Sequence, residues 1–278
     1  MTSPALGAHT FGFVWRSSAA EALEALGEAG FRHVELMATP PHFDPWRFDP
    51  SLMQTLRRLL GRYRLSLIAL DLASNDVNLA SPSRDVVDFA VDAYTKAIAR
   101  AAELGARSIC VGSGRRHALL SSANERAMTT FKPAFARIHA EARRRGVRVA
   151  LENHPQGLLA DAPTIEAFLS AEGYGDVCVI YDVANAFAIG EDPARGLEIL
   201  WPRIDVVHLS DSPRGQWRHD PIGSGDIDFA AIADVVRTRE FAGTVVLEIL
   251  SDDPLGDLVD GVARLKGLGL PLADVLRR

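Results

Sequence analysis

The sequence predicts a (β/α)8 barrel that forms a single domain over residues 1–278. Three observations predict it: short β-branched runs alternate with longer segments of helical period, eight such units each occupy about 35 residues, and no linker separates them. An open doubly wound sheet is the alternative fold. It usually carries a glycine-rich phosphate-binding sequence after its first strand, and FGFVWRSS has none.

The expected strands are eight short runs rich in β-branched residues. They cover residues 8–14, 31–37, 65–71, 107–112, 147–152, 176–182, 204–209 and 243–249. Segments of helical period lie between them, among them residues 18–29, 85–104, 125–145 and 254–268. Glycines that can adopt the left-handed conformation of a helix end follow several helices: Gly30, Gly61, Gly105 and Gly146.

Composition and charge exclude several classes of protein. The formal charge is −6, from 30 basic and 36 acidic residues, and this acidic balance argues against a nucleic-acid partner. Cys110 and Cys178 each lie in an apolar run, which is typical of reduced, buried thiols. We expect no signal peptide, because no basic segment precedes a long apolar run, and no membrane partner. A cytoplasmic location is therefore the expectation.

Polar residues end the last four expected strands. These residues are Glu152, Asp182, His208 and Glu248. In a (β/α)8 barrel the carboxyl ends of the strands meet at one rim, so we expect the four side chains to converge there. Three buried carboxylates would repel one another unless a cation compensated them. One imidazole and three carboxylates suit one divalent metal ion, either Mn, Mg, Co or Zn.

Five segments together resemble the xylose isomerase-like barrel superfamily of sugar isomerases and epimerases. They are LENHP at 151–155, YDVAN at 181–185, HLSD at 208–211, PIGSGDIDF at 221–229 and VLEI at 246–249. That superfamily includes tagatose 3-epimerase-like, hydroxypyruvate isomerase-like and inosose isomerase/dehydratase-like enzymes. The resemblance implies that Glu152, Asp182, His208 and Glu248 bind the metal. It also implies that Glu152 and Glu248 act as catalytic acid and base on opposite faces of the substrate.

The same resemblance suggests substrate contacts and shows one departure. The family often has a histidine three residues after the strand-six aspartate, where this chain has Asn185. This departure weakens the transfer of any specific epimerase activity. An arginine six residues beyond the strand-seven histidine often binds substrate, and Arg214 stands there, with Arg218 and His219 as nearby alternatives.

Further polar residues follow the ends of earlier strands. His154, two residues beyond Glu152, is a candidate catalytic base or substrate contact, or else a loop residue that packs on its neighbour. Arg115 and His117, in GSGRRH, would receive a carboxylate or phosphate if they face the barrel mouth, and otherwise form a solvated loop. Glu35 ends the second strand and is expected either to line the mouth or to form a salt bridge at the rim.

Aromatic residues suggest an apolar wall for the site. Phe11, Phe13 and Trp15 alternate along the expected first strand, and Trp46 and Trp217 are further candidates. Such residues would pack against a sugar ring or fill the barrel core.

The favoured function is metal-dependent isomerisation or epimerisation of a keto-sugar, cyclitol or related polyhydroxy carbonyl compound. Glu152 or Glu248 would remove the proton next to the carbonyl, and the other would return it. The spelling LENHP also resembles LETHP-like segments of 3-dehydroshikimate dehydratase-like barrels, so loss of water with His154 as base is the alternative. An abasic-site endonuclease and a non-catalytic binding protein are weaker alternatives. The expected partner is a small polyhydroxy keto substrate, and barrels of this kind often form homo-oligomers.

Overall fold

The computed structural model describes residues 3–72, 77–117, 119–120 and 122–272. Eight parallel strands form a closed barrel in which each strand pairs with its neighbours in the sequence and β8 pairs with β1. The predicted barrel fold is thereby confirmed. The strands are β1 (Ala5–His9), β2 (His33–Ala38), β3 (Ser66–Leu72), β4 (Ser108–Gly112), β5 (Arg148–Glu152), β6 (Cys178–Asp182), β7 (Ile204–Leu209) and β8 (Thr244–Leu247).

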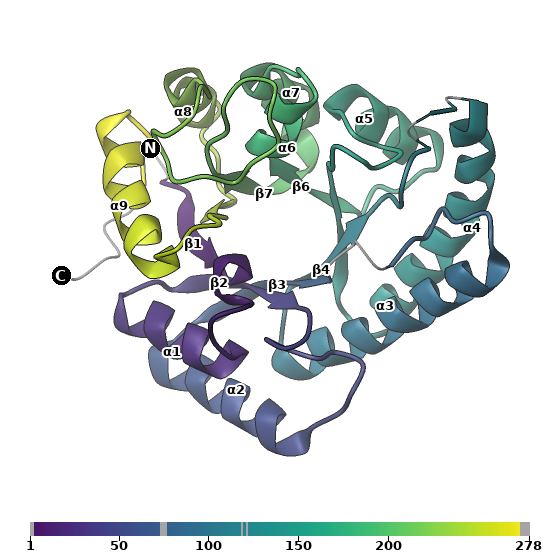
Figure 1. Ribbon diagram of the computed structural model, residues 1–278, viewed down its shortest axis with the longest axis horizontal. Helices are drawn as coiled ribbons and strands as arrows, with labels where there is room; N and C mark the ends of the chain where they lie inside the picture. Colours follow the sequence, from purple (N-terminus) through teal and green to yellow (C-terminus); the bar gives the residue numbers. More distant parts are fainter. Residues whose placement is uncertain (1–2, 73–76, 118, 121, 273–278) are drawn as a thin grey trace.

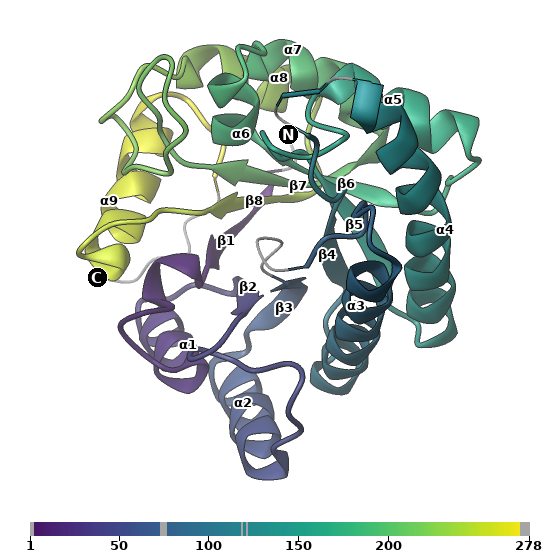
Figure 2. The same ribbon diagram turned by 45° about the vertical axis from the view of Figure 1, so that its right-hand side comes forward.

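Helices surround the strands as an outer layer (Figures 1 and 2). They are α1 (Ala19–Glu28), α2 (Pro50–Tyr63), α3 (Arg84–Leu104), α4 (Ser122–Arg144), α5 (Ala162–Ala171), α6 (Val183–Ala188), α7 (Pro193–Leu200), α8 (Phe229–Thr238) and α9 (Pro254–Gly267), with the short 3-10 helices η1 (Phe11–Phe13) and η2 (Trp201–Arg203). Several begin where a side chain accepts a backbone N–H of the first turn, which satisfies donors that the helix itself leaves unpaired. The residues that do so are Ser18, Asp49, Asp161, Asp182, Asp192, Asp228 and Asp253.

Two apolar cores lie on the two sides of the barrel wall. The large core fills the space between strands and helices, and a small one fills the barrel interior with residues that include Ala150, Ile180, Val206 and Val246. Because side chains of a strand alternate between faces, the residue two positions after each of these also points inward. Those residues are Glu152, Asp182, His208 and Glu248. The alternation therefore aims all four into the mouth of the barrel.

The first strand is shorter than predicted. It ends at His9, and Phe11–Phe13 form η1 instead of continuing the strand over residues 8–14. The Nδ1 atom of His9 accepts the Phe11 N–H at 3.0 Å, which turns the chain. Gly12 then lies so close to the wall that an added Cβ would be 2.5 Å from the Ile249 carbonyl oxygen. The alternating aromatics are consequently not neighbours on a strand, and Trp15 is 79% exposed.

The predicted left-handed helix ends are confirmed at three glycines and wrong at the fourth. Gly30, Gly105 and Gly146 have φ values of 96°, 73° and 72°. Gly61 lies inside α2, which continues to Tyr63, and Arg64 adopts the left-handed conformation with φ 53°. The Leu65 N–H donates to the Leu60 carbonyl oxygen at 2.8 Å, which terminates the helix. The helix therefore ends one turn later than expected.

No helix within the described part of the chain is both long enough and apolar enough to cross a membrane.

Candidate metal centre and active site

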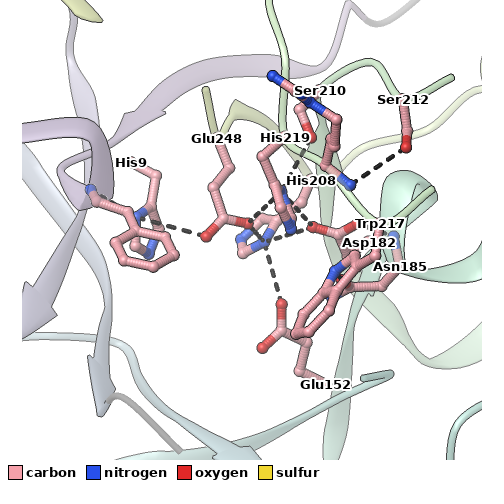
Figure 3. A network of polar contacts seen from close by, with 12 residues as sticks. His9, Glu152, Asp182, Asn185, His208, Ser210, Ser212, Trp217, His219 and Glu248 are labelled. Carbon is pink, nitrogen blue, oxygen red and sulfur yellow. Dashed lines mark hydrogen bonds and ion pairs between the residues drawn. The ribbon is translucent and has the colours of Figure 1, made fainter. Parts of the chain in front are cut away.

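Four side chains from neighbouring strand ends converge on one point. One ligand atom from each of Glu152, Asp182, His208 and Glu248 lies within 4.8 Å of the corresponding atoms of the others. His208 is central, and Figure 3 shows the three carboxylates directed toward its ring. Its Nδ1 atom lies 3.4 Å from Glu152 Oε1, 3.7 Å from Asp182 Oδ2 and 2.9 Å from Glu248 Oε2.

Three of these converging atoms are buried polar atoms that make no hydrogen bond of good geometry, although they lie close to one another. Among the described residues, no hydrogen-bond partner is found for Asp182 Oδ2, His208 Nδ1 or Glu248 Oε2. A buried polar atom without a partner costs free energy, and clustered carboxylates add repulsion. A divalent cation at this point would satisfy all three atoms together. The donor set of three carboxylates and one imidazole therefore fits such an ion.

Glu35 supports His208 and does not line the mouth. Its side chain is completely buried, and its Oε2 contacts His208 Nε2 on the side of the ring away from the converging atoms. Of the two expectations for Glu35, a position lining the mouth and a salt bridge, its burial and its contact with His208 favour the salt bridge. A carboxylate on Nε2 holds the proton there and leaves Nδ1 available as an electron-pair donor.

A network of amide groups fixes Asp182. Its backbone N–H donates to Asn153 Oδ1 at 2.7 Å, and its own Oδ1 accepts the Asn185 N–H at 2.6 Å. Asn185 in turn donates through Nδ2 to the Asn153 carbonyl at 3.0 Å and accepts the Trp217 indole N–H at 2.7 Å. These bonds hold one oxygen of Asp182 and leave Oδ2 directed at His208.

A cavity of about 280 Å³ opens beside the converging atoms. Five of the residues predicted to form the site line it: Glu152, Glu248, His154, Asn185 and His219. Phe11 and Trp217, two of the predicted aromatic residues, also line the cavity, whereas Phe13, Trp15 and Trp46 are not among the lining residues. The cavity thus combines a strongly acidic floor with apolar sides, which is typical of a small-molecule site.

The structure does not bring the other predicted substrate contacts to the cavity lining. Arg214 lies over the Phe187 ring, with its guanidinium 5.5 Å from the ring centre. The lining arginine is Arg218, whose Nε is 2.7 Å from Asp220 Oδ2. Arg115 and His117 stand in the loop after β4 and are exposed, and the backbone N–H of Leu120 occupies His117 Nδ1 at 3.0 Å.

Two histidines of the lining differ in their surroundings. His154 packs edge-on against Trp217 at 4.9 Å between ring centres, and its Nδ1 accepts the Gln156 N–H at 3.2 Å. Burial lowers the pKa of His154, so its ring is neutral near pH 7. His219 Nδ1 lies 3.7 Å from both Asp182 Oδ2 and Glu248 Oε2, which places it at the edge of the candidate metal centre.

The two glutamates of the centre have opposite pKa shifts in the metal-free protein. Burial raises the pKa of Glu152 to about 8. Burial acts the same way on Glu248, but the neighbouring His9, His208 and His219 outweigh it and hold the pKa of Glu248 well below its usual value. The pKa of His208 is raised well above its usual value, because attraction to Glu35 and Glu248 outweighs its burial. At neutral pH Glu152 is thus protonated in the metal-free protein, and the raised pKa of His208 favours its cationic form, with a proton on each ring nitrogen.

Sequence reasoning missed three residues of this region: His9, Asp71 and Cys110. Asp71 and Cys110 line the cavity, and His9 Nε2 lies 3.3 Å from Asp71 Oδ2. The signal that identified the four converging residues was also present here. Asp71 follows the apolar run LSLIAL as Glu152 follows VAL, so the same rule of a polar residue at a strand end would have found it.

Comparison with known proteins identifies the family. The model of the family described as xylose isomerase-like TIM barrel matches residues 23–268. The chain belongs to this family. The resemblance inferred from the sequence motifs is thereby confirmed.

Individual relatives of the xylose isomerase-like TIM barrel are distant in sequence. An L-ribulose 3-epimerase of Mesorhizobium japonicum is 24% identical over 257 residues, which cover 89% of this chain and 82% of that protein. A solved D-tagatose 3-epimerase-like protein superposes with a TM-score of 0.82 at 21% identity and covers 95% of this chain and 96% of its own. A 3-keto-D-glucoside 4-epimerase from E. coli has a TM-score of 0.78 at 17% identity, with 95% and 100% covered. At these identities the solved structures establish the shared fold.

Proposed function

We propose that this protein is a divalent-metal-dependent isomerase or epimerase of a keto-sugar, cyclitol or related polyhydroxy carbonyl compound. The observation that carries the proposal is the convergence of four ligand atoms within 4.8 Å beside a cavity that Glu152 and Glu248 both line. The names of the relatives, an L-ribulose 3-epimerase and a D-tagatose 3-epimerase-like protein among them, support a reaction of this class.

The proposed chemistry is proton transfer at the carbon next to the carbonyl. Glu152, Asp182, His208 and Glu248 would hold the metal ion, either Mn, Mg, Co or Zn. When bound, the ion supplies Lewis-acid stabilisation of negative charge on substrate oxygens. Glu152 and Glu248 reach the cavity from β5 and from the end of β8, so one removes the proton and the other returns it. Return to the same carbon from the opposite face gives an epimer, and return to the neighbouring carbon gives an isomer.

The cavity histidine His154 is better suited to donate a hydrogen bond than to remove a proton. Its Nδ1 lone pair accepts the Gln156 N–H, so the proton of the neutral ring resides on Nε2. A base would need that position unprotonated. We therefore propose His154, Asn185 and His219 as substrate contacts, and this tautomer disfavours the alternative in which His154 initiates loss of water.

Isotope exchange tests this function. The metal-loaded protein would be incubated in D2O with a panel of ketoses and keto-cyclitols, and products followed by NMR and absorbance. We expect one carbon-bound hydrogen to be replaced by deuterium, with formation of an epimer or isomer and no loss of water. A rise in absorbance from a conjugated product would instead establish a dehydratase. Equal turnover by the metal-free protein would overturn the metal dependence.

The Glu152→Gln variant tests the assignment of the site itself. It keeps the shape of the side chain but removes the acid–base group and a charged ligand, so both metal affinity and exchange should fall. Glu198→Gln is the matched control, because Glu198 lies on α7 and pairs there with Arg195. Unchanged metal affinity and exchange in Glu152→Gln would contradict the proposal. The cytoplasmic location and the homo-oligomer stay predictions from the sequence.

A further inference from the structure

Asp71 is a carboxylate of the cavity that does not belong to the four converging residues. It lies on β3, and its side chain is 12% exposed toward the cavity that it lines. One of its oxygens lies within 4.8 Å of ligand atoms of Cys110 and Glu152, and one lies within 4.8 Å of ligand atoms of His9 and Glu248. Asp71 therefore stands close to both glutamates that we propose as acid and base.

His9 places an N–H beside Asp71, and not a lone pair for a second metal ion. His9 Nδ1 accepts the Phe11 N–H at 3.0 Å, so in the neutral ring the proton resides on Nε2, which lies 3.3 Å from Asp71 Oδ2. Nε2 has no hydrogen-bond partner of good geometry among the described residues, although it is buried. The nearest carboxylate oxygen to Nε2 is that of Asp71, with Glu35 Oε2 4.0 Å away, and a protonated Nε2 cannot serve as a metal ligand in this tautomer.

Cys110 is a second neighbour of Asp71 that offers a proton and not a lone pair. Its Sγ donates to Glu152 Oε2 at 3.4 Å, so the thiol keeps its proton. A protonated thiol is a poor metal ligand. The Cys110 thiol is thus engaged by Glu152, and the Asp71 carboxylate stays partly open to the cavity, with 12% of its side chain exposed.

Among the described lining residues, no arginine or lysine pairs with Asp71, and its nearest basic group is His9 Nε2 at 3.3 Å. Within the described lining, the arginine is Arg218, and its guanidinium pairs with Asp220 at 2.7 Å. The lining beside Asp71 continues with the apolar residues Leu72 and Met37. A carboxylate on the cavity lining accepts hydrogen bonds strongly and repels anions.

We propose that Asp71 determines substrate specificity: its carboxylate accepts a hydrogen bond from a hydroxyl of the bound substrate and excludes molecules that carry phosphate or carboxylate at that position. The inference rests on the proposed function and narrows it to neutral polyhydroxy carbonyl compounds. Sugar phosphates and sugar acids place a negative charge against Asp71. Neutral sugars place a donor there.

The test uses Asp71→Asn, which keeps the shape and removes the charge. Metal-loaded wild type and variant would be compared on a neutral ketose and on the phosphate ester of the same ketose. For the neutral ketose, loss of a charged acceptor should raise KM about 10-fold, with kcat changed by less than about threefold. For the phosphate ester, kcat/KM should rise at least about 10-fold, because the like charge is gone.

Asp176→Asn is the matched control, because Asp176 pairs with His139 and Arg143 and is not a lining residue of this cavity. It should leave both substrates unaffected. Calorimetric titration with Mn²⁺ should give a metal affinity in Asp71→Asn within about threefold of wild type. Asp71→Ser is the second variant should the asparagine variant fail to fold, and it predicts the same change in preference.

Each outcome bears on the proposal. An unchanged preference between ketose and phosphate ester in Asp71→Asn would overturn the role of Asp71 while leaving the proposed function intact. A loss of metal affinity of more than about threefold would show that Asp71 acts on the metal centre, as a ligand or as support for one, and would also overturn it. A wild-type protein that turns over none of the ketoses would overturn the proposed function, and the specificity inference with it.

Discussion

The carboxylate of Glu35 contacts one nitrogen of His208, and the other nitrogen of that ring faces three carboxylates. The two residues are 173 positions apart in the sequence, and both are buried. A buried carboxylate on Nε2 fixes the tautomer and the orientation of the ring. It also makes the imidazole a better electron-pair donor toward a cation.

Replacing Glu35 with Gln should therefore weaken metal binding without removing a metal ligand. We expect the affinity for Mn²⁺ or Mg²⁺ to fall about 10- to 100-fold, because the neutral amide no longer polarises the ring. Isothermal titration calorimetry measures this directly. Glu24→Gln is the control, because Glu24 lies on α1 and forms an exposed ion pair with Arg62. Wild-type affinity in Glu35→Gln would show that the contact does not tune His208.

Metal binding should stabilise the fold. An ion that binds only the folded state at a concentration of about 100 times its Kd adds about 2.7 kcal/mol of stability, which corresponds to a rise in Tm of about 5–10 °C. Thermal denaturation with and without a chelator measures this rise. In Asp182→Asn the rise should be largely lost, since one charged ligand is missing. A Tm that does not respond to metal in the wild type would mean that the four residues hold no ion.

Metal affinity should increase with pH between about 6 and 8. Burial raises the pKa of Glu152 to about 8, and the pKa of His208 is also raised, so both groups carry protons in the metal-free protein at pH 7. The ion must displace these protons, and each one displaced makes affinity rise about 10-fold per pH unit below its pKa. Titration calorimetry in buffers of different ionisation enthalpy counts the protons released. A pH-independent affinity across this range would contradict protonation of both groups.

The same pKa shift of Glu152 predicts how the metal-free fold responds to pH. Its folded-state pKa lies above its ordinary value of 4.5, so the folded protein binds this proton more tightly than the unfolded chain. The contribution of Glu152 to stability is full below its ordinary pKa and is lost as pH rises toward about 8. Urea denaturation of wild type and Glu152→Gln at several pH values measures it. The difference between the two should change over this range, and a constant difference would exclude the raised pKa.

Two glycine substitutions should have opposite effects on stability. Gly12→Ala places a Cβ 2.5 Å from the Ile249 carbonyl oxygen, so the backbone at Ile249 must shift. We expect the free energy of unfolding to fall by about 1–3 kcal/mol. Gly61→Ala lies inside α2, where a Cβ meets nothing within 4 Å. It should add about 0.5–1 kcal/mol through helix propensity. Urea denaturation measures both, and equal effects in the two variants would contradict the packing described at Gly12.

Local pattern was sufficient to predict the barrel and the four converging residues. Each strand is short, apolar and β-branched, and each of Glu152, Asp182, His208 and Glu248 stands where such a run ends. The first strand was misjudged because FGFV has strand propensity, while the chain actually turns on a bond from Phe11 to His9. Tertiary packing at Gly12 overrides that propensity.

The sequence by itself determined which residues end the strands, because the alternation of side chains and the apolar runs are local properties of the chain. Only the tertiary structure decided what those ends face. Closure of the barrel brings Glu35 into contact with the Nε2 atom of His208. It places Asp71 close to both Glu152 and Glu248. Packing of the loop after β7 places Arg218, and not Arg214, in the cavity lining. These relationships join residues from strands distant in sequence, and their distances depend on barrel register and on loop packing, which no local pattern encodes.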